Sequence, residues 1–192
     1  MAGLRERNRL RTREEIKAAA LRLINEQGYA ATTVDQIAKA ADVSPSTFFR
    51  YFPTKEDAVL TDDYDDAMIE SFRSQPPDLP VLEAFRRSIR QIFGNVSDED
   101  TRTELIRMRT IFEVPELRDR MLGTLAENIR MMAGLVAERT GRSPNDPAVM
   151  HLAGAVVGVA IAAMARAVAE PDGNPMEMLD QGMADLINGL RL

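Results

Sequence analysis

Hydrophobic residues recur at helical spacing through most of the chain, and no segment alternates hydrophobic and polar residues convincingly enough to predict a strand. The first run follows Thr12, which forms a capping-box sequence with Glu15, and Gly28 is a natural stop. We therefore expect an all-α protein. The pattern predicts about nine helices, near residues 12–28, 33–42, 45–52, 54–74, 81–93, 101–112, 115–141, 147–169 and 175–190.

Two of these helices are short and follow one another closely. Thr33 and Gln36 repeat the capping box at the start of the first, and Ser44-Pro45 places a cap and a proline at the start of the second. Pro53 prevents the second helix from continuing. Two short helices joined by a tight turn, behind a longer helix, form the layout of a helix-turn-helix, whose second helix enters the major groove of DNA.

The second short helix has the composition that this role requires. Phe48 and Phe52 are four residues apart and can face the first helix. Its other side chains offer hydroxyls and a guanidinium to DNA, from Ser44, Ser46, Thr47, Arg50 and Tyr51. Arg50 can donate two hydrogen bonds to O6 and N7 of a guanine, or it can contact a phosphate, and both interpretations remain open.

Charge separates this region from the rest of the chain. The protein has a net charge of −6, but residues 1–55 carry ten Lys or Arg against six Asp or Glu, and residues 56–192 carry fourteen against twenty-four. A basic head on an acidic body indicates that the head meets a polyanion. Lys55 lies in a predicted first helical turn, where a cation opposes the helix dipole, and a nearby phosphate would explain it.

Five arginines stand at alternate positions up to the start of the first predicted helix, Arg5, Arg7, Arg9, Arg11 and Arg13. They form either a solvated, frayed terminus or a basic arm that enters the neighbouring minor groove.

From Thr12 to about Val59, with TTVDQIAKAADVSPSTFFRYFPTKEDAV over residues 32–59, the chain closely resembles the DNA-binding head of TetR-family transcriptional regulators. The resemblance implies an all-helical homodimer, usually a repressor, whose body binds a small effector. It places a phosphate contact at Lys55. Phe49 stands where many relatives have tyrosine, so we expect an apolar contact there, for example to a thymine methyl. The implied contacts with double-stranded DNA fall on Thr33, Ser44, Pro45, Ser46, Thr47, Phe49 and Tyr51.

These observations divide the chain into two predicted domains. Residues 1–55 form an N-terminal arm and helix-turn-helix domain, and residues 56–192 form a helical ligand-binding and dimerisation domain. The operator is expected to be palindromic, because such dimers read two half-sites.

Composition excludes several other classes of protein. The absence of cysteine excludes disulfides, thiolate zinc sites and cysteine nucleophiles, and the single histidine, His151, is a poor basis for a metal site. No cofactor or metal is expected. The longest apolar run, residues 152–165, is shorter than a membrane span needs and no secretory signal opens the chain, so we expect a cytoplasmic protein without a membrane partner.

Small residues mark the predicted helix over residues 147–169 as a close-packing element. One side can pack on its own body, and the other would let a second helix approach closely. The predicted dimer interface combines it with the last helix and includes Gly154, Ala155, Gly158, Ala162, Leu179, Met183 and Leu186. The alternative is a core seam within a single chain.

An effector site is the least determined feature of the sequence. On a helical wheel, Arg109 lies within an apolar arc while Arg107 points away, so Arg109 needs an anionic partner, either a carboxylate such as Glu83 or Glu113 or the acidic head of an apolar ligand. Methionines could line an adaptable apolar cavity or simply fill the core. The candidate effector residues are Met68, Phe72, Met108, Arg109 and Phe112.

Two alternative functions remain. Asp62, Asp63 and Asp66 reproduce the spacing with which all-helical isoprenoid synthases hold magnesium and diphosphate, but no second acidic motif accompanies them, and we expect no enzyme. A DNA-binding protein that responds to no effector would share every residue of the head.

Overall fold

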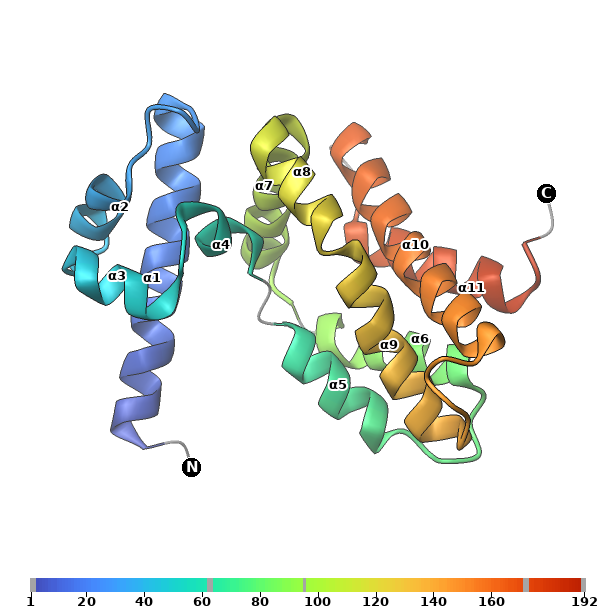
Figure 1. The fold of residues 1–192 in the computed structure, drawn as a ribbon. Helices are drawn as coiled ribbons and strands as arrows, with labels where there is room; N and C mark the ends of the chain where they lie inside the picture. Colours follow the sequence, from blue (N-terminus) through green and yellow to red (C-terminus); the bar gives the residue numbers. More distant parts are fainter. Residues whose placement is uncertain (1–2, 62–63, 95, 171–172, 191–192) are drawn as a thin grey trace. The chain divides into compact units, whose positions relative to one another are not determined.

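The computed structural model describes residues 3–61, 64–94, 96–170 and 173–190, and helices are the only regular elements within these ranges. The predicted all-α fold class is therefore confirmed. Contacts group the chain into two compact units, labelled by their helices in Figure 1. The head unit comprises residues 1–61 and 109–119, and the body unit comprises residues 62–108 and 120–192.

The described residues form eleven helices, two more than the pattern predicted. They are α1 (Leu4–Gln27), α2 (Val34–Ala40), α3 (Pro45–Tyr51), α4 (Lys55–Leu60), α5 (Tyr64–Ser74), α6 (Val81–Phe93), α7 (Asp98–Glu113), α8 (Pro115–Gly123), α9 (Leu125–Thr140), α10 (Pro147–Ala169) and α11 (Pro175–Ile187).

The two additional helices arise because two predicted segments are interrupted. The segment over residues 54–74 breaks at Thr61, whose backbone is extended and whose N–H closes the last turn on the Asp57 carbonyl. The segment over residues 115–141 breaks at Thr124, between α8 and α9.

The predicted start of the first helix is wrong. α1 begins at Leu4, two turns before Thr12, so Thr12 is an interior residue and caps nothing. Leu, Arg and Glu dominate the added turns, and these residues have high helix propensity. The predicted end is confirmed, because Gly28 follows the last turn with a φ of 86°.

The core of the head unit lies between α1 and the helix-turn-helix. Ile16 and Ala20 of α1 are fully buried, as is Ile37 of α2. Phe48 of α3 and Phe52, which follows the last residue of α3, are also buried, with ring centroids 6.1 Å apart, which confirms the predicted inward face.

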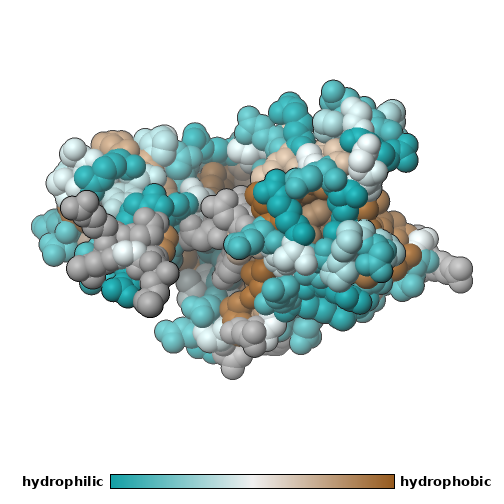
Figure 2. Space-filling model, turned by 90° about the horizontal axis from the view of Figure 1, so that it is seen from below, coloured by the Kyte–Doolittle hydropathy of each residue, from teal (hydrophilic) through white to brown (hydrophobic). Residues whose placement is uncertain are grey.

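The core of the body unit is formed by α5, α6, α9, α10 and α11. Phe72 of α5 stacks on Phe85 of α6 with a centroid separation of 4.1 Å, and both rings are buried. Met183 of α11 is fully buried in the same cluster. In Figure 2, hydrophilic residues cover most of the visible head unit, while hydrophobic residues show between them on the body unit.

α10 is long and apolar enough to span a membrane by length and composition alone. It packs against α9 and α11 of the body unit, and 22% of its most apolar stretch is buried within the chain. One stripe of the helix remains exposed, at Gly158, Ala162 and Ala165.

Candidate nucleic-acid interface

The N-terminus of α3 is held by its own first residues. Ser44 is the N-cap, and its hydroxyl accepts the backbone N–H of Thr47 at 3.0 Å. The Thr47 hydroxyl lies 2.9 Å from the same oxygen, and Pro45 occupies the first helical position. Both predicted signals are confirmed, and they fix the helix start from which Ser46 is presented to solvent.

The outer face of α3 combines an exposed aromatic ring with a cation. The Phe49 side chain is 56% exposed, and its ring meets Phe48 edge to face at a centroid distance of 5.5 Å. The exposed Arg50 guanidinium lies 5.4 Å from the centroid of the half-buried Tyr51 ring. An exposed, well-supported phenyl ring can contact a thymine methyl, and a guanidinium can donate to guanine.

The N-terminus of α2 presents a second polar edge. The Thr33 hydroxyl accepts the backbone N–H of Gln36 at 3.3 Å, and the Gln36 side chain accepts the Thr33 N–H at 2.9 Å, which confirms the predicted capping box. The side-chain oxygen of Gln36, Oε1, also accepts a hydrogen bond from the side-chain amide of Gln27. These contacts hold the exposed Thr33 at the N-terminus of α2, where the helix dipole favours an anion.

Lys55 has protein partners that the sequence did not reveal. Its ammonium donates to the carbonyls of Tyr29 and Thr32 at 2.8 and 2.9 Å and lies 3.8 Å from the centroid of the Tyr29 ring. A phosphate is therefore not required to explain a lysine in this first turn, because two carbonyl oxygens and a ring face stabilise the cation. Phosphate binding by Lys55 remains a prediction.

Glu56 completes the link between α4 and the loop after α1. It accepts a short hydrogen bond from the Tyr29 hydroxyl. Partial burial by itself would raise the pKa of Glu56, but the Tyr29 hydroxyl, further hydrogen bonds and the charge of Lys55 outweigh it and lower the pKa. Lys55 and Glu56 thus fix the loop that leads to Thr33.

The arginine-rich terminus is helical and is not an extended arm. Residues 4–13 lie in α1, and an α-helix of about 10–12 Å diameter is too wide for a minor groove of about 6 Å. The helical conformation of these residues does not match an extended arm in the minor groove, and their contact with DNA remains a prediction. Arg13 turns toward the helix-turn-helix, with its guanidinium 5.6 Å from the centroid of the Phe52 ring.

The predicted DNA contacts come together, because all of them lie on α2, α3, α4 and their caps in the head unit. The predicted effector residues are divided. Met68 and Phe72 belong to the body core, and Met108 is buried, whereas Arg109 and Phe112 fall in the segment grouped with the head unit.

The helical-wheel assignment of the two arginines in α7 is wrong. Arg107 is the buried one, with its guanidinium 2.6 Å from Glu104 and its side chain 10% exposed. Arg109 is 51% exposed and pairs with Glu113 at 3.6 Å, which confirms the predicted protein carboxylate as its partner. The apolar arc was too short to decide which flank of the helix the neighbouring elements cover.

The predicted interface residues divide into an exposed and a buried group. Gly158 and Ala162 are exposed on α10, and Gly154 and Ala155 beside them are partly exposed. Met183 is fully buried inside its own chain, so its assignment to an interface is wrong and the alternative of a core seam applies to it. Leu179 and Leu186 of α11 are partly buried.

A pocket between α6 and α11 was missed by the sequence reasoning. It has a volume of about 570 Å³, and its lining includes Ile89, Arg90, Phe93, Met176 and Asp180. The sequence holds only one hint of it, a strongly amphipathic α6 with basic residues four apart. These residues meet an acidic residue nearly a hundred positions later, which no local pattern shows.

Asp180 bridges two arginines at the edge of this pocket. It pairs with Arg86 at 3.0 Å and with Arg90 at 2.6 Å. Hydrogen bonds from Arg90 and Arg86 lower the pKa of Asp180 from 3.8 to about 2. The predicted acidic cluster is not tested by the structure, because Asp62, Asp63 and the side chain of Asp66 lie outside the described residues.

Comparison with known proteins gives a consistent result. The family described as "Bacterial regulatory proteins, tetR family" matches residues 16–60, and the "MftR C-terminal domain" of TetR regulators matches residues 79–191. The HTH-type transcriptional regulator TcmR of Streptomyces glaucescens is 34% identical over 151 residues, which cover 75% of this chain and 67% of TcmR. RutR of Escherichia coli K12 is 31% identical over 153 residues, 76% of this chain and 71% of RutR.

A solved structure is similar over nearly the whole chain. Thermus thermophilus FadR, a TetR-family repressor in complex with lauroyl-CoA, has 25% sequence identity and a TM-score of 0.55, covering 94% of this chain and 95% of FadR. The two family matches together span both the helix-turn-helix and most of the remaining helices. The chain therefore belongs to the TetR family of DNA-binding transcriptional regulators, which are not enzymes.

Proposed function

We propose that the protein is a cytoplasmic, homodimeric repressor that binds a palindromic operator and is released from it by a small effector. Residues 1–55 read the DNA, and residues 56–192 bind the effector and the second chain. The observation that carries the proposal is the construction of α3. Its buried phenylalanines anchor the helix, while Ser46, Phe49 and Arg50 face solvent from a capped helix start.

The exposed stripe of α10 supports the second chain as a partner. Gly158, Ala162 and Ala165 place no large side chain on the surface, and a Cβ added at Gly158 meets no described neighbour within 4 Å. A second copy of the same helix can therefore approach closely and bury a stripe that is otherwise apolar and exposed. A two-fold dimer presents two recognition helices, which matches a palindrome.

An apolar effector with an anionic head is the ligand class that we propose. FadR of Thermus thermophilus, 25% identical, was crystallised with lauroyl-CoA, which has this chemistry. The candidate site in the described body unit is the pocket between α6 and α11, where Ile89, Phe93 and Met176 offer apolar surface and Arg90 offers a cation. A ligand carboxylate or phosphate that recruits Arg90 would compete with Asp180 for it.

Selection from a random pool of duplexes by the purified protein, at near-physiological salt, tests the DNA-binding proposal. We expect an enriched palindrome, with half-site centres about one helical turn apart, about 34 to 36 Å, or at another spacing set by the dimer. A pool in which no sequence is enriched, with protein of native helical content, would contradict a sequence-specific repressor.

Release from the enriched duplex tests the effector class. Titration of lauroyl-CoA into the labelled complex should lower fluorescence anisotropy, with a decrease in affinity of about 5- to 150-fold at saturation. Free CoA is the matched control for the anionic head alone. Unchanged anisotropy across fatty acyl-CoA chain lengths would instead favour a regulator without an acyl effector.

A further inference from the structure

The net positive charge of the N-terminal region lies outside the helix-turn-helix. Residues 1–13 contain five arginines and one glutamate, whereas residues 14–55 contain five basic and five acidic residues. The segment that matches the TetR head, residues 16–60, is likewise neutral, with five of each. Since phosphate neutralisation dominates nonspecific affinity for DNA, a neutral helix-turn-helix lacks much of that attraction.

The arginine-rich segment is helical and presents exposed arginines. Arg7, Arg9 and Arg11 are exposed on the first turns of α1, and the first buried residue after Gly3 among the described side chains is Ile16. Figure 1 shows these turns continuing beyond the part of α1 that packs on α2 and α4. Ten residues of helix are about 15 Å long, and each DNA strand presents a phosphate every ~3.4 Å of helix axis.

Arginine has a high helix propensity, but the electrostatics of the helix do not favour Arg7 and Arg11 at these positions. Cations near a helix N-terminus oppose the helix dipole, and like charges four residues apart, such as Arg7 and Arg11, repel each other. Arg11 is compensated only in part, by an exposed pair with Glu15 at 3.5 Å. A polyanion alongside these turns removes both penalties.

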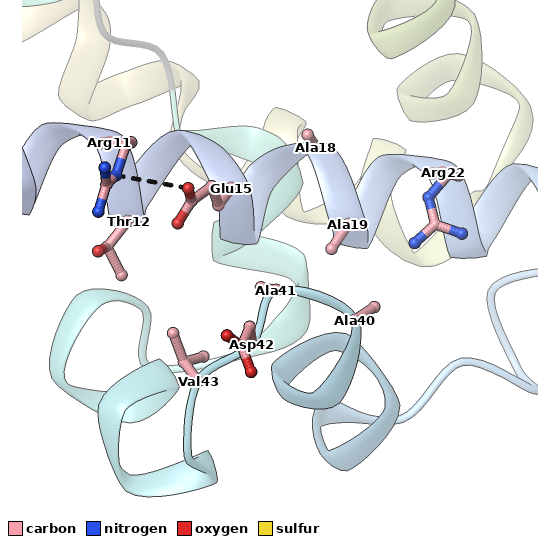
Figure 3. A pocket seen from close by; sticks show the side chains of 10 residues that line it. All are labelled: Arg11, Thr12, Glu15, Ala18, Ala19, Arg22, Ala40, Ala41, Asp42 and Val43. Carbon is pink, nitrogen blue, oxygen red and sulfur yellow. Dashed lines mark ion pairs between the residues drawn. The ribbon is translucent and has the colours of Figure 1, made fainter.

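Residues 11–13, at the end of these turns, lie beside the recognition helix and the turn that precedes it. Arg11 and Thr12 line one groove together with Asp42 and Val43, the residues that lead into α3, and the groove has a volume of about 610 Å³. Figure 3 shows Arg11 on the α1 side of this groove and Val43 facing it. Arg13 contacts Phe52 at the end of α3.

We propose that the first three turns of α1 form a separate phosphate-binding element, which contacts the DNA backbone beside each operator half-site. Arg7 and Arg11, four residues apart on one face of the helix, supply much of the sequence-independent attraction of an otherwise neutral helix-turn-helix. The element adds affinity and no base preference, because its partners are phosphates. The inference rests on the proposed binding of DNA by the head unit.

The test compares the salt dependence of operator binding among full-length variants. The double substitution Arg7→Gln with Arg11→Gln should lower the slope of log affinity against log salt by about 1 for each phosphate that is no longer neutralised, and leave the ranking of operator sequences unchanged. Arg7→Lys with Arg11→Lys should keep the slope, because lysine also neutralises phosphates.

A charge-matched control separates local contacts from net charge. Lys39→Gln with Arg118→Gln removes two exposed cations from the same unit, outside this groove, and should leave the slope close to that of the native protein. Circular dichroism should show native helical content in every variant. An unchanged slope in the Arg7/Arg11 glutamine variant, or an equal decrease in the control, would overturn the inference. Failure of the native protein to prefer any duplex would instead contradict the proposed function.

Discussion

Single side chains of the head unit divide into those that hold the recognition helix and those that it presents. Phe48 and Phe52 are buried and orient α3, whereas Phe49 and Arg50 are exposed one and two positions after Phe48. A helix advances 100° per residue, so the two residues that follow a buried position point away from the side that it faces. Function at this scale depends on the presented residues, and stability depends on the others.

Arg50→Ala should relax base preference at one position of each half-site. If the guanidinium donates to guanine O6 and N7, its removal costs about 1–3 kcal/mol at the preferred base and little at others. Competition binding with duplexes that vary one base at a time measures the change. Uniform weakening across all duplexes would assign Arg50 to a phosphate, and Lys39→Ala on α2 controls for the removed charge.

Lys55→Met should destabilise the head unit as well as weaken DNA binding. The substitution removes both hydrogen bonds to the carbonyls of Tyr29 and Thr32, and we expect a decrease of about 1–3 kcal/mol in the free energy of unfolding. Urea unfolding checks this, with Lys39→Met as the exposed control. If the Lys55→Met variant has native stability but a smaller salt dependence of DNA binding, Lys55 contacts a phosphate and does not stabilise the fold.

At the scale of elements, helix boundaries are set by residues with specific backbone requirements. Ser44, Thr54 and Asn174 accept backbone N–H groups at the starts of α3, α4 and α11. Gly141 ends α9 in the left-handed region, with φ of 68°. Such signals act within a few residues, and for that reason most boundaries in the chain were predictable.

Two glycines of α9 predict opposite effects from the same substitution. Gly141→Ala forces a side chain into the left-handed region and should destabilise the protein by about 1 kcal/mol. Gly134 lies in the helix interior, and a Cβ added there meets no described atom within 4 Å. Gly134→Ala should therefore stabilise the protein by about 0.5–1 kcal/mol. Thermal unfolding of both variants measures the signs, and equal signs would contradict the assigned end of α9.

The link between α6 and α11 should weaken in acid. Because the folded-state pKa of Asp180 is about 2, below its usual 3.8, its stabilising contribution is full above about pH 4 to 5 and is lost as the pH falls through 2. Asp180→Asn should therefore lower stability at pH 7 by roughly 1 kcal/mol, with solvent screening taken into account. The difference from the native protein should vanish near pH 2.

Urea unfolding between pH 2 and 7 tests this dependence. Asp185→Asn, an exposed position later in α11, is the matched control. A native-to-variant difference that stays constant down to pH 2 would exclude the Asp180 carboxylate as its source.

At the scale of the whole molecule, charge and exposed apolar surface lie in different units. The chain has a net charge of −6, yet its first 13 residues are strongly basic, while the exposed small-residue stripe belongs to α10 in the body unit. DNA repels the acidic body unit. The repulsion therefore favours contact between DNA and the basic first turns of α1 together with α3.

Ala162→Arg should convert the proposed dimer into folded monomers. The arginine would place a long, charged side chain in a stripe that has room only for close helix contact. Sedimentation velocity measures the change in mass, and Ala126→Arg, exposed on α9, is the control. A dimer that persists in the Ala162 variant would move the interface away from this stripe.

The sequence by itself determined the helical fold, the helix-turn-helix and the residues that α3 presents. Caps, prolines and periodic phenylalanines act over three or four residues. The structural roles of Thr33, Ser44, Pro45 and Phe48 can therefore be predicted from their sequence neighbours alone. The family resemblance was readable for the same reason, because the head is one compact run of such signals.

Only the tertiary structure decided what surrounds each charged or apolar side chain. The partners of Lys55 lie 23 and 26 residues away, and those of Asp180 lie 90 and 94 residues away. Burial of Arg107 in place of Arg109, and of Met183 inside its own chain, likewise depends on elements distant in sequence. Helix periodicity identifies an apolar face, but packing selects which of its flanks are covered.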